Sequence, residues 1–300
     1  MTATPDTEVN NNSSLCFLNG DYLALNEAKV SVLDRGFIFA DGIYEVIPAF
    51  FGKPFRLEQH LKRLSKNLQA IKMENPYSMI EWHKIFSDLI AKNNFAKTDC
   101  SLYLQVTRGV AKRDHIFPDN PSQTVFVMLN PMPSPDLTKL EKGLRVITRE
   151  DIRWQYCHIK SISLLGNIML KQEASENNAD ETVLIRNGNI TEGSSSNIFI
   201  VKNNTIITPE KNNYLLPGIT RDLIVEIAKL KNLPLEERAF NEDELFNADE
   251  VWLSSSLKEV SPVCYVDNKP IANGKPGEHW RNMFNLFQEY KASLENNPNA

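Results

Sequence analysis

Three prolines within residues 130–136 constrain the fold more than any other feature of this sequence. Proline lacks a backbone N–H and fixes φ, so such a segment fits neither a helix nor a central strand. We therefore expect it to link two domains. The predicted organisation is a disordered polar tail over 1–14, a small N-terminal α/β domain over 15–130, a linker over 131–136 and a larger C-terminal domain over 137–290.

The periodicity of apolar residues predicts an α/β (α+β) chain. Asn19-Gly20 lies between two strand-like runs, a strong hairpin signal, and Gly52-Lys53 is expected to form a second turn. Apolar residues at spacings of 4, 3, 4 and 3 predict an amphipathic helix on Leu57, Leu61, Leu64, Leu68 and Ile71. Further helices are expected over about 79–93, 166–178 and 220–231, and strands over 101–107, 124–130, 144–148, 182–185, 197–201, 205–208 and 250–253.

Composition narrows the function classes. A hydrophobic share of 42% and a charged share of 24% are ordinary for a globular protein. The net charge of -5 argues against a nucleic-acid surface, and no apolar run reaches the roughly 20 residues of a membrane helix. The start has no signal-peptide pattern, the four cysteines have no CxxC spacing, and the histidines have no metal-ligand spacing. These features predict a cytoplasmic protein without a metal site.

Lys160 is the first candidate for chemistry, because it stands in the apolar stretch CHIKSISLLGNIML. Lysines normally lie in solvated surroundings. Burial disfavours the ammonium form and leaves a neutral amine that can attack a carbonyl and form a Schiff base. The alternative is a lysine at the end of a strand whose ammonium group reaches solvent, and the residue pattern alone leaves both open.

Two further segments could bind charged groups. Glu192 opens TEGSSSNIF, where it is either part of a polar turn or a fixed anion facing a cationic ring nitrogen. In LPGITRDLIVEIAKL, Pro217 and Gly218 form a turn, and Thr220 is the expected N-cap of an amphipathic helix. A helix N-terminus offers free backbone N–H groups to an anion such as phosphate, although ordinary capping is the commoner role.

Cationic side chains supply the remaining candidates. Arg63 lies on the first predicted helix, where it either reaches solvent or binds a phosphate. Arg113 and His115, in TRGVAKRDHIFP, form a compact pair on a loop. Most such pairs are simply solvated, but this one could bind a carboxylate through two hydrogen bonds.

Six motifs in a fixed order together closely resemble the fold-type IV pyridoxal-phosphate (PLP) enzymes. The resemblance spans nearly the whole chain from about Leu15 and rests on DRGFIFADGIYEV (34–46), HLKRL (60–64), IKSISLLGNIMLKQEA (159–174), TEGSSSNIF (191–199), LLPGITRD (215–222) and KEVSPV (258–263). That family includes branched-chain aminotransferases, D-amino acid aminotransferases and aminodeoxychorismate lyases. It implies a two-domain fold with the active site between the domains and PLP bound to the C-terminal one.

The resemblance implies a role for each matched residue. Lys160 matches the lysine that holds PLP as a Schiff base and moves the proton during transamination. Glu192 matches the acid that keeps the pyridine nitrogen protonated, which makes the ring an electron sink. Arg63 matches an arginine that binds the phosphate, and Tyr44 a tyrosine of the substrate pocket. Further contacts to the phosphate and the ring are implied for Leu216, Ile219, Thr220, Ser255 and Ser256.

The RxH pair, Arg113 and His115, decides the subfamily. It resembles the trap that binds the substrate's α-carboxylate in D-amino acid aminotransferases, which are homodimers whose RxH loop reaches the partner's active site. Fixing the carboxylate fixes which face of Cα meets the lysine, so orientation selects the stereoisomer. The resemblance therefore implies transamination between a D-amino acid, such as D-alanine, and a 2-oxo acid, such as 2-oxoglutarate.

Several alternatives stay open. On the same fold, the chain could be an L-branched-chain aminotransferase, an (R)-amine transaminase or an aminodeoxychorismate lyase. From a different class, it could be a non-catalytic binding module. The sequence also departs from the family pattern: Gly166 stands where proline is common, Cys157-His158 has no assigned role, and Pro48 lies near the end of the pocket strand. The preferred substrate is therefore open.

Overall fold

The computed structural model describes residues 14–296, so the predicted polar tail lies outside the described residues except for Ser14. Contacts divide the chain into two units. The first unit contains the chain up to Pro133 together with Lys160–Ser163, and the second contains Ser134–Ile159 and the chain from Leu164 onward. In the sequence, the boundary between Pro133 and Ser134 falls within the linker predicted at 131–136. Residues 160–163 belong to the first unit although they come after this linker.

The first unit is built on an antiparallel sheet of six strands in the order β2-β1-β6-β5-β3-β4. The predicted hairpin at Asn19-Gly20 is confirmed, because Leu18 pairs with Asp21 across it. The central strands β3, β5 and β6 pair in register over most of their length. The strands are β1 (Leu15–Leu18), β2 (Asp21–Ala24), β3 (Gly42–Phe50), β4 (Lys53–Pro54), β5 (Cys100–Thr107) and β6 (Thr124–Pro131).

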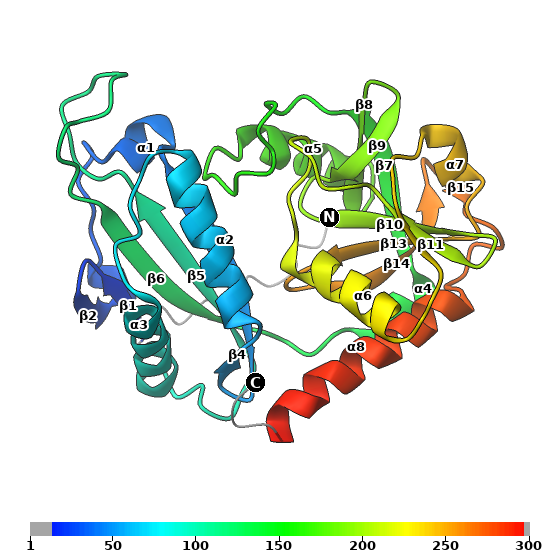
Figure 1. The fold of residues 1–300 in the computed structure, drawn as a ribbon, viewed down its shortest axis with the longest axis horizontal. Coiled ribbons are helices and arrows are strands. Elements are labelled where there is room, and N and C mark those ends of the chain that lie inside the picture. Colours follow the sequence, from blue (N-terminus) through cyan, green and yellow to red (C-terminus); the bar gives the residue numbers. More distant parts are fainter. Residues whose placement is uncertain (1–13, 297–300) are drawn as a thin grey trace. The chain divides into compact units, whose positions relative to one another are not determined.

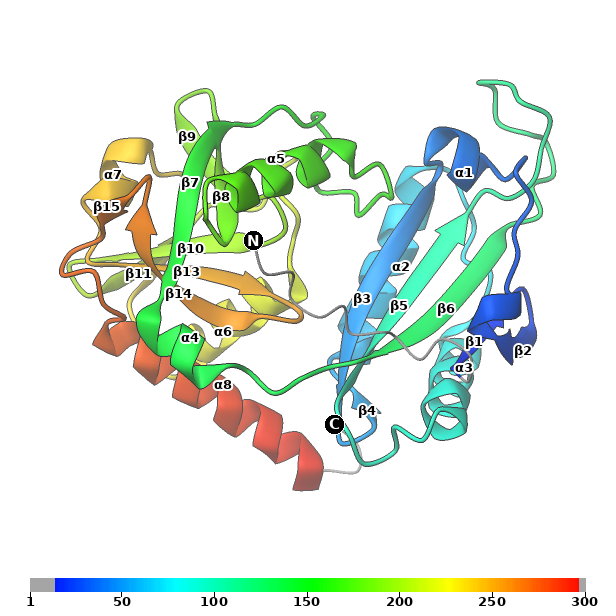
Figure 2. The same cartoon turned by 180° about the vertical axis from the view of Figure 1, so that it is seen from behind.

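Two long helices pack on this sheet, α2 (Leu57–Ala70) on β3 and α3 (Met79–Lys92) on β1 and β6. Figure 1 shows both helices in front of the strands, and the view from behind in Figure 2 shows β3, β5 and β6 in front of them. The predicted apolar stripe of α2 is confirmed, since its four leucines are buried. A short helix, α1 (Arg35–Phe39), which periodicity could not predict, precedes β3, and η1 (Leu25–Glu27) follows β2.

The turn predicted at Gly52-Lys53 is wrong by one residue. Phe50 pairs with Lys53, so Phe51 and Gly52 form the turn. Both have positive φ, 52° and 74°, as a two-residue type I′ hairpin turn requires. The sequence misled because glycine was expected to open the turn, whereas here it occupies the second turn position and the bulkier Phe51 adopts the left-handed conformation as well.

The second unit holds a mixed sheet with the strand order β12-β11-β10-β13-β14-β7-β8-β9, and β15 pairs with β14. All five strands predicted from the sequence in this part of the chain are present, within one or two residues at each end. The bounds are β7 (Leu144–Glu150), β8 (Glu181–Arg186), β9 (Asn189–Gly193), β10 (Asn197–Lys202), β11 (Thr205–Thr208), β12 (Leu235–Glu237), β13 (Glu250–Ser255), β14 (Glu259–Val266) and β15 (Lys269–Pro270).

The described part of this unit contains five helices. The helix α5 (Leu165–Glu176) packs on β7 and β8, while α6 (Ile219–Leu230) packs on β13 and on α8 (Glu278–Asn296); α6 and α8 can be followed in Figure 1. Asp136 caps the short α4 (Leu137–Lys142), and α7 (Glu242–Phe246) follows β12. No helix within residues 14–296 is both long enough and apolar enough to span a membrane.

The start of α6 differs from the expectation that Thr220 is its N-cap. The N-cap is Gly218, with extended backbone angles (φ -69°, ψ 136°), and Thr220 already lies in the first turn. A Cβ at position 218 would stand 2.0 Å from the side-chain oxygen of Asn197, so the chain can pass this close only as glycine. The prediction was wrong because this close contact between α6 and β10 is tertiary.

Candidate functional site

Lys160 is attached to the first sheet by its backbone. The N–H of Tyr44 donates to the carbonyl of Lys160 at 3.0 Å, and the N–H of Ile162 donates to the carbonyl of Gly42 at 3.1 Å. Ser161 forms a bridge with Ile43 in the same antiparallel pairing. This short segment therefore continues the sheet along the free edge of β3, and its backbone geometry holds the lysine in place.

The side chain of Lys160 lies beside Tyr44. Its Nζ stands 4.1 Å from the centre of the Tyr44 ring, a cation–π contact. The Tyr44 ring in turn stacks on Tyr103, with 5.9 Å between ring centres, and the Tyr103 hydroxyl donates to Gln105 at 2.7 Å. Two residues that the sequence singled out separately, Lys160 and Tyr44, are thus adjacent.

Three buried residues, Glu45 of β3 together with His60 and Arg63 of α2, form a hydrogen-bonded ionic cluster. The Nε of Arg63 donates to Glu45 Oε1 at 2.8 Å and its Nη2 donates to Oε2 at 2.7 Å, while His60 Nδ1 lies 2.8 Å from Oε2. Burial opposes ionisation of Glu45, but the charges and hydrogen bonds of Arg63 and His60 outweigh it and lower the pKa of Glu45 to about 2. Arg63 is thus bound in a two-point ion pair to Glu45, a partner that sequence reasoning missed, and its predicted contact with a phosphate stays a prediction.

Arg113 and His115 lie on the loop between β5 and β6, and both side chains are exposed. Both contact Phe39 of α1: the His115 ring centre is 5.5 Å from that of Phe39, and the Arg113 guanidinium carbon is 5.4 Å from the Phe39 centre. The arginine and the histidine of the RxH pair thus both contact the same aromatic side chain.

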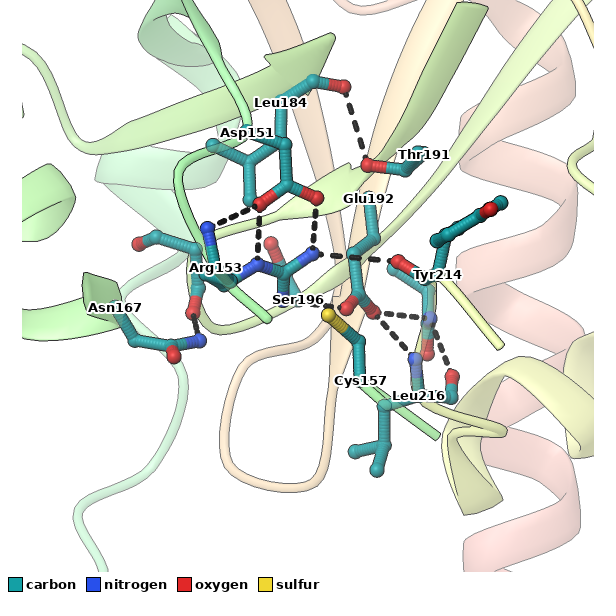
Figure 3. Close-up of polar contacts among 12 residues, drawn as sticks. Asp151, Arg153, Cys157, Asn167, Leu184, Thr191, Glu192, Ser196, Tyr214 and Leu216 are labelled. Atoms are coloured by element: carbon teal, nitrogen blue, oxygen red, sulfur yellow. Dashed lines mark hydrogen bonds and ion pairs between the residues drawn. The ribbon is translucent and has the colours of Figure 1, made fainter. Parts of the chain in front are cut away.

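In the second unit, Glu192 lies near the end of β9, and only 3% of it is exposed. Figure 3 shows its polar contacts. Its carboxylate accepts from Arg153 Nη1 at 2.7 Å, from the Asn197 side chain at 3.1 Å and from the backbone N–H of Leu216 at 3.0 Å. The Asn197 amide also donates to the carbonyl of Leu216 at 2.8 Å. Asn197 thereby joins Glu192 to the loop before α6.

Arg153 is shared between two carboxylates, as Figure 3 shows. It donates to Asp151 through Nε at 2.9 Å and Nη2 at 3.0 Å, and only its Nη1 serves Glu192. Arg186 also pairs with Asp151, at 3.0 Å. Burial opposes ionisation of Asp151, but these arginines hold its pKa below the usual range. For Glu192, burial dominates the opposing charge and hydrogen bond of Arg153 and raises the pKa to about 7.

The elevated pKa of Glu192 predicts a pH-dependent stability in the ligand-free protein. Below pH 4.5 the carboxyl is protonated in both the folded and the unfolded chain; between 4.5 and about 7 the folded chain binds the extra proton, so stability falls as pH rises. The loss amounts to roughly 3 kcal/mol across this window. Urea unfolding of the wild type and Glu192→Gln at pH 5 and pH 8 measures it. A stability difference between the two proteins that stays constant with pH would contradict the prediction.

The N-terminus of α6 lies close to this carboxylate. Leu216, whose N–H binds Glu192, stands three residues before Ile219, the first residue of the helix. Ile219 and Thr220 are buried, and the N-cap residue Gly218 has no side chain to cap this helix end. The first backbone N–H groups of a helix lack intrahelical partners and carry the positive end of its dipole. An anion is the natural partner for them.

The serines predicted to supply hydroxyl donors lie at the end of strand β13. Ser255 Oγ accepts from the N–H of Lys258 at 3.2 Å, and Ser256 is half-buried in the turn after it. The preceding residue, Ser254, pairs with Asn197 of β10, and its buried Oγ has no hydrogen-bond partner within residues 14–296. The residue pattern pointed to all three serines at 254–256 as possible donors, whereas the family resemblance implied a role for Ser255 and Ser256 alone.

Sequence reasoning also missed Asp151, Arg153 and Asn197, which surround Glu192. The available signal was the alternation of acid and arginine in DIR at 151–153, next to a predicted strand. Such alternation is common on protein surfaces, so only the burial of Arg153, with 7% of its side chain exposed, distinguishes it.

The residues of the second unit fit a ligand with two opposite charges. Its anionic group would bind at the N-terminus of α6, and its cationic nitrogen would meet Glu192, whose charge Arg153 only partly balances. PLP carries both, a phosphate and a protonated pyridine nitrogen, so the residues present fit this cofactor. Among residues 14–296 there is no group of three His, Cys, Asp or Glu side chains placed to hold a metal ion.

Comparisons with known proteins agree with this chemistry. A model of the amino-transferase class IV family matches residues 42–266. The chain is 41% identical over 274 residues to the D-alanine aminotransferase of Staphylococcus aureus (strain N315), covering 91% of this chain and 96% of that protein. It is 38% identical over 270 residues to the D-alanine aminotransferase of Bacillus licheniformis, covering 90% and 94%.

Solved structures with the same fold include branched-chain enzymes. The branched-chain amino acid aminotransferase of Escherichia coli matches with a TM-score of 0.87 and 25% identity, covering 92% of this chain and 94% of that one. The corresponding enzyme of T.th., solved with pyridoxamine 5'-phosphate, matches with a TM-score of 0.86 and 26% identity, covering 92% and 93%.

Proposed function

The chain belongs to the class IV aminotransferase family, and we therefore propose that it is a PLP-dependent transaminase that moves the amino group of a D-amino acid, such as D-alanine, to a 2-oxo acid, such as 2-oxoglutarate. One observation carries the proposal: the buried, partly balanced carboxylate of Glu192 lies next to an uncapped helix N-terminus. This pairing suits the ring nitrogen and the phosphate of PLP.

When bound, PLP supplies an aldehyde that accepts the amino group and a ring that withdraws electrons from the substrate's Cα. Glu192 would hold the proton on the ring nitrogen, because that cation completes its charge balance. The backbone N–H groups of Ile219 and Thr220 would bind the phosphate, with the hydroxyls of Ser255 and Ser256 and with Arg63 as further donors, and Leu216 would pack on the ring. Lys160 Nζ would hold the aldehyde carbon and then accept and return the Cα proton.

The choice of the D-isomer rests on Arg113 and His115. A guanidinium and an imidazole next to one another can donate several charge-assisted hydrogen bonds to one carboxylate. With the α-carboxylate fixed there and the side chain beside Tyr44, only one face of Cα is available for proton transfer. The similarity to D-alanine aminotransferases over 91% of the chain supports this assignment.

The second candidate is an L-branched-chain aminotransferase, favoured by the likeness to solved enzymes of that class. An (R)-amine transaminase or an aminodeoxychorismate lyase shares the fold as well. A chiral half-reaction separates them: the cofactor absorbance of the PLP-loaded protein should change with D-alanine and stay constant with L-leucine. The reverse result would refute D-specificity. A colourless protein that takes up no PLP would support the alternative of a non-catalytic binding module.

Substitution of Arg113 by alanine is expected to lower kcat/KM for D-alanine by about tenfold to a hundredfold, mainly through a higher KM. The reason is the loss of charge-assisted hydrogen bonds to the carboxylate, each worth about 1.5–3 kcal/mol. Steady-state kinetics on Arg113→Ala and on Lys112→Ala, its exposed cationic neighbour, measures the effect. Equal kinetics in the two variants would remove Arg113 from the substrate site.

We also propose that the protein is a homodimer located in the cytoplasm. The helix α5 exposes Leu165, Ile168 and Met169, which follow one another at helical spacing on one side, and the RxH loop exposes Ile116 with 78% of its surface accessible. Exposed apolar groups of this kind commonly form contacts between subunits. The four cysteines are free and buried, which supports a reducing compartment. A mass measurement in solution tests the dimer.

A further inference from the structure

The short helix α1 contains an arginine that is almost completely enclosed. Only 4% of the Arg35 side chain is exposed, and its Nε donates to Asp41 at 2.8 Å. Asp34, the N-cap of α1, accepts from the N–H of Gly36 at 2.7 Å and is fixed by the hydroxyls of Thr107 and Thr124. The helix that carries Arg35 is therefore attached firmly to the end of β5 and the start of β6.

The free end of this arginine points to the backbone of the RxH loop. Arg35 Nη1 donates to the carbonyl of Asp114 at 2.6 Å and lies 3.4 Å from the carbonyl of Ile116. These two carbonyls flank His115 on either side. The buried guanidinium of Arg35 thus binds the loop backbone 79 residues further along the chain, next to the histidine proposed to bind the substrate's carboxylate.

The same helix supports the two side chains of the RxH pair. Phe39, one turn after Arg35, contacts both Arg113 and His115, as described above, and the guanidinium of Arg35 lies 4.8 Å from the centre of the Phe39 ring. Arg35 holds the loop backbone while Phe39 provides the surface on which the two side chains rest.

A second buried arginine fixes the loop further along. The guanidinium of Arg108 lies 3.6 Å from the centre of the Phe117 ring, and Arg108 shares Asp41 with Arg35 through bonds of 2.8 and 3.0 Å. Burial opposes ionisation of Asp41, but the two arginines hold its pKa below its usual range. At the base of the loop, Gly109 has φ +83° and passes so close to Ser122 that a Cβ would stand 1.7 Å from its carbonyl oxygen.

We propose that Arg35 is a positioning residue that holds the RxH loop so that Arg113 and His115 meet the substrate's carboxylate together. The inference rests on the proposed function, since it assumes that this pair binds the carboxylate. Arginine suits the task because its planar fork binds Asp41 on one side and the two loop carbonyls on the other. A lysine ammonium is a single compact group, so it can replace only part of the hydrogen bonds to Asp41 and to the two loop carbonyls.

The experiment is a mutant cycle on the PLP-loaded protein with wild type, Arg35→Met, Arg113→Ala and the double variant, with D-alanine as substrate. In Arg35→Met we expect KM to rise about tenfold, the scale of one lost hydrogen bond from a charged donor, while kcat at saturation stays close to wild type. In the Arg113→Ala background, the same change should add little, because the group it positions is absent. Arg35→Lys should lie between Arg35→Met and wild type.

A readout independent of activity is tryptic cleavage after Lys112 and Arg113. If Arg35 holds the loop, Arg35→Met should be cut there several times faster than wild type under native conditions. The matched control is Asn93→Ala, which removes hydrogen bonds between the end of α3 and Leu15 in the same unit, whereas the hydrogen bonds of Asn93 within residues 14–296 go to Leu15 and Leu89 and not to the loop. It should lower the Tm without raising KM and without faster cleavage at these two sites.

The outcomes separate the inference from the proposed function. If wild type does not act on D-alanine, the proposed function fails at once; if Arg113→Ala has wild-type KM, the carboxylate role fails and the inference falls with it. If wild type and Arg113→Ala behave as expected but Arg35→Met multiplies the KM equally in both backgrounds, or leaves tryptic cleavage unchanged, Arg35 has only a structural role. In that case the inference alone is overturned.

Discussion

Replacement of Lys160 by alanine is expected to reduce transamination by roughly 10⁴-fold, the upper end of what one positioned proton-transfer group contributes. The loss should be this large because the same amine would hold the cofactor and carry the Cα proton, and the phenol of Tyr44 beside it cannot form a Schiff base. Single-turnover kinetics of Lys160→Ala with D-alanine measures the effect. Borohydride treatment of wild type followed by peptide mapping should label residue 160.

The matched control is Lys160→Arg, which keeps a cation near the Tyr44 ring and the same backbone bonds to β3, but has no amine that can attack an aldehyde. It should be as inactive as Lys160→Ala while retaining the wild-type Tm. Transamination by either variant at the wild-type rate, or borohydride labelling of another residue, would eliminate Lys160 as the cofactor-binding group.

The second large effect concerns stability. Substitution of Arg153 by methionine is expected to lower the free energy of unfolding by about 3–5 kcal/mol, because it removes the cation shared by two buried carboxyl groups. Asp151 then keeps only Arg186, and Glu192 must either stay charged without a cation or take up a proton. Urea unfolding at neutral pH measures the loss. Adding Glu192→Gln to Arg153→Met should recover part of it, since an amide in this position carries no charge to balance.

Arg149→Met is the matched control. Arg149 also pairs with an acid, Glu173, but the two side chains are 35% and 41% exposed, so water already screens them. Such pairs contribute about 1 kcal/mol or less. A loss in Arg153→Met no larger than in Arg149→Met would show that the buried network does not hold Glu192 in the way described.

The residue pattern indicated Lys160, but the stability prediction depends on contacts that a linear pattern does not contain. Arg153 and Glu192 are 39 residues apart, and the DIR segment resembles many exposed segments. The motif that contains Arg35 was recognised in the sequence as part of a family resemblance, but its bond to the loop around His115 could not be derived from spacing. The N-cap at Gly218 was misplaced by two residues for the same reason, since it depends on packing against Asn197 of β10. The turn at Phe51-Gly52 was misplaced by one residue because glycine occupies its second position.

Most of the helices and strands were predictable from the order of residues, because the burial of one helix face or one strand face leaves a repeat of 3.6 or 2 residues that is visible without any partner. The leucines of α2 and the alternating residues of β5 are examples. Ordered motifs also indicated the family and the residues of the proposed site. Only the folded structure shows that Glu192 binds a single nitrogen of Arg153, whose other nitrogens bind Asp151. It also shows that the backbone of Lys160 pairs with the edge of β3 and that Arg35 binds a loop 79 residues away. Desolvation and charge balance depend on which groups meet in space, and chain position does not encode that locally.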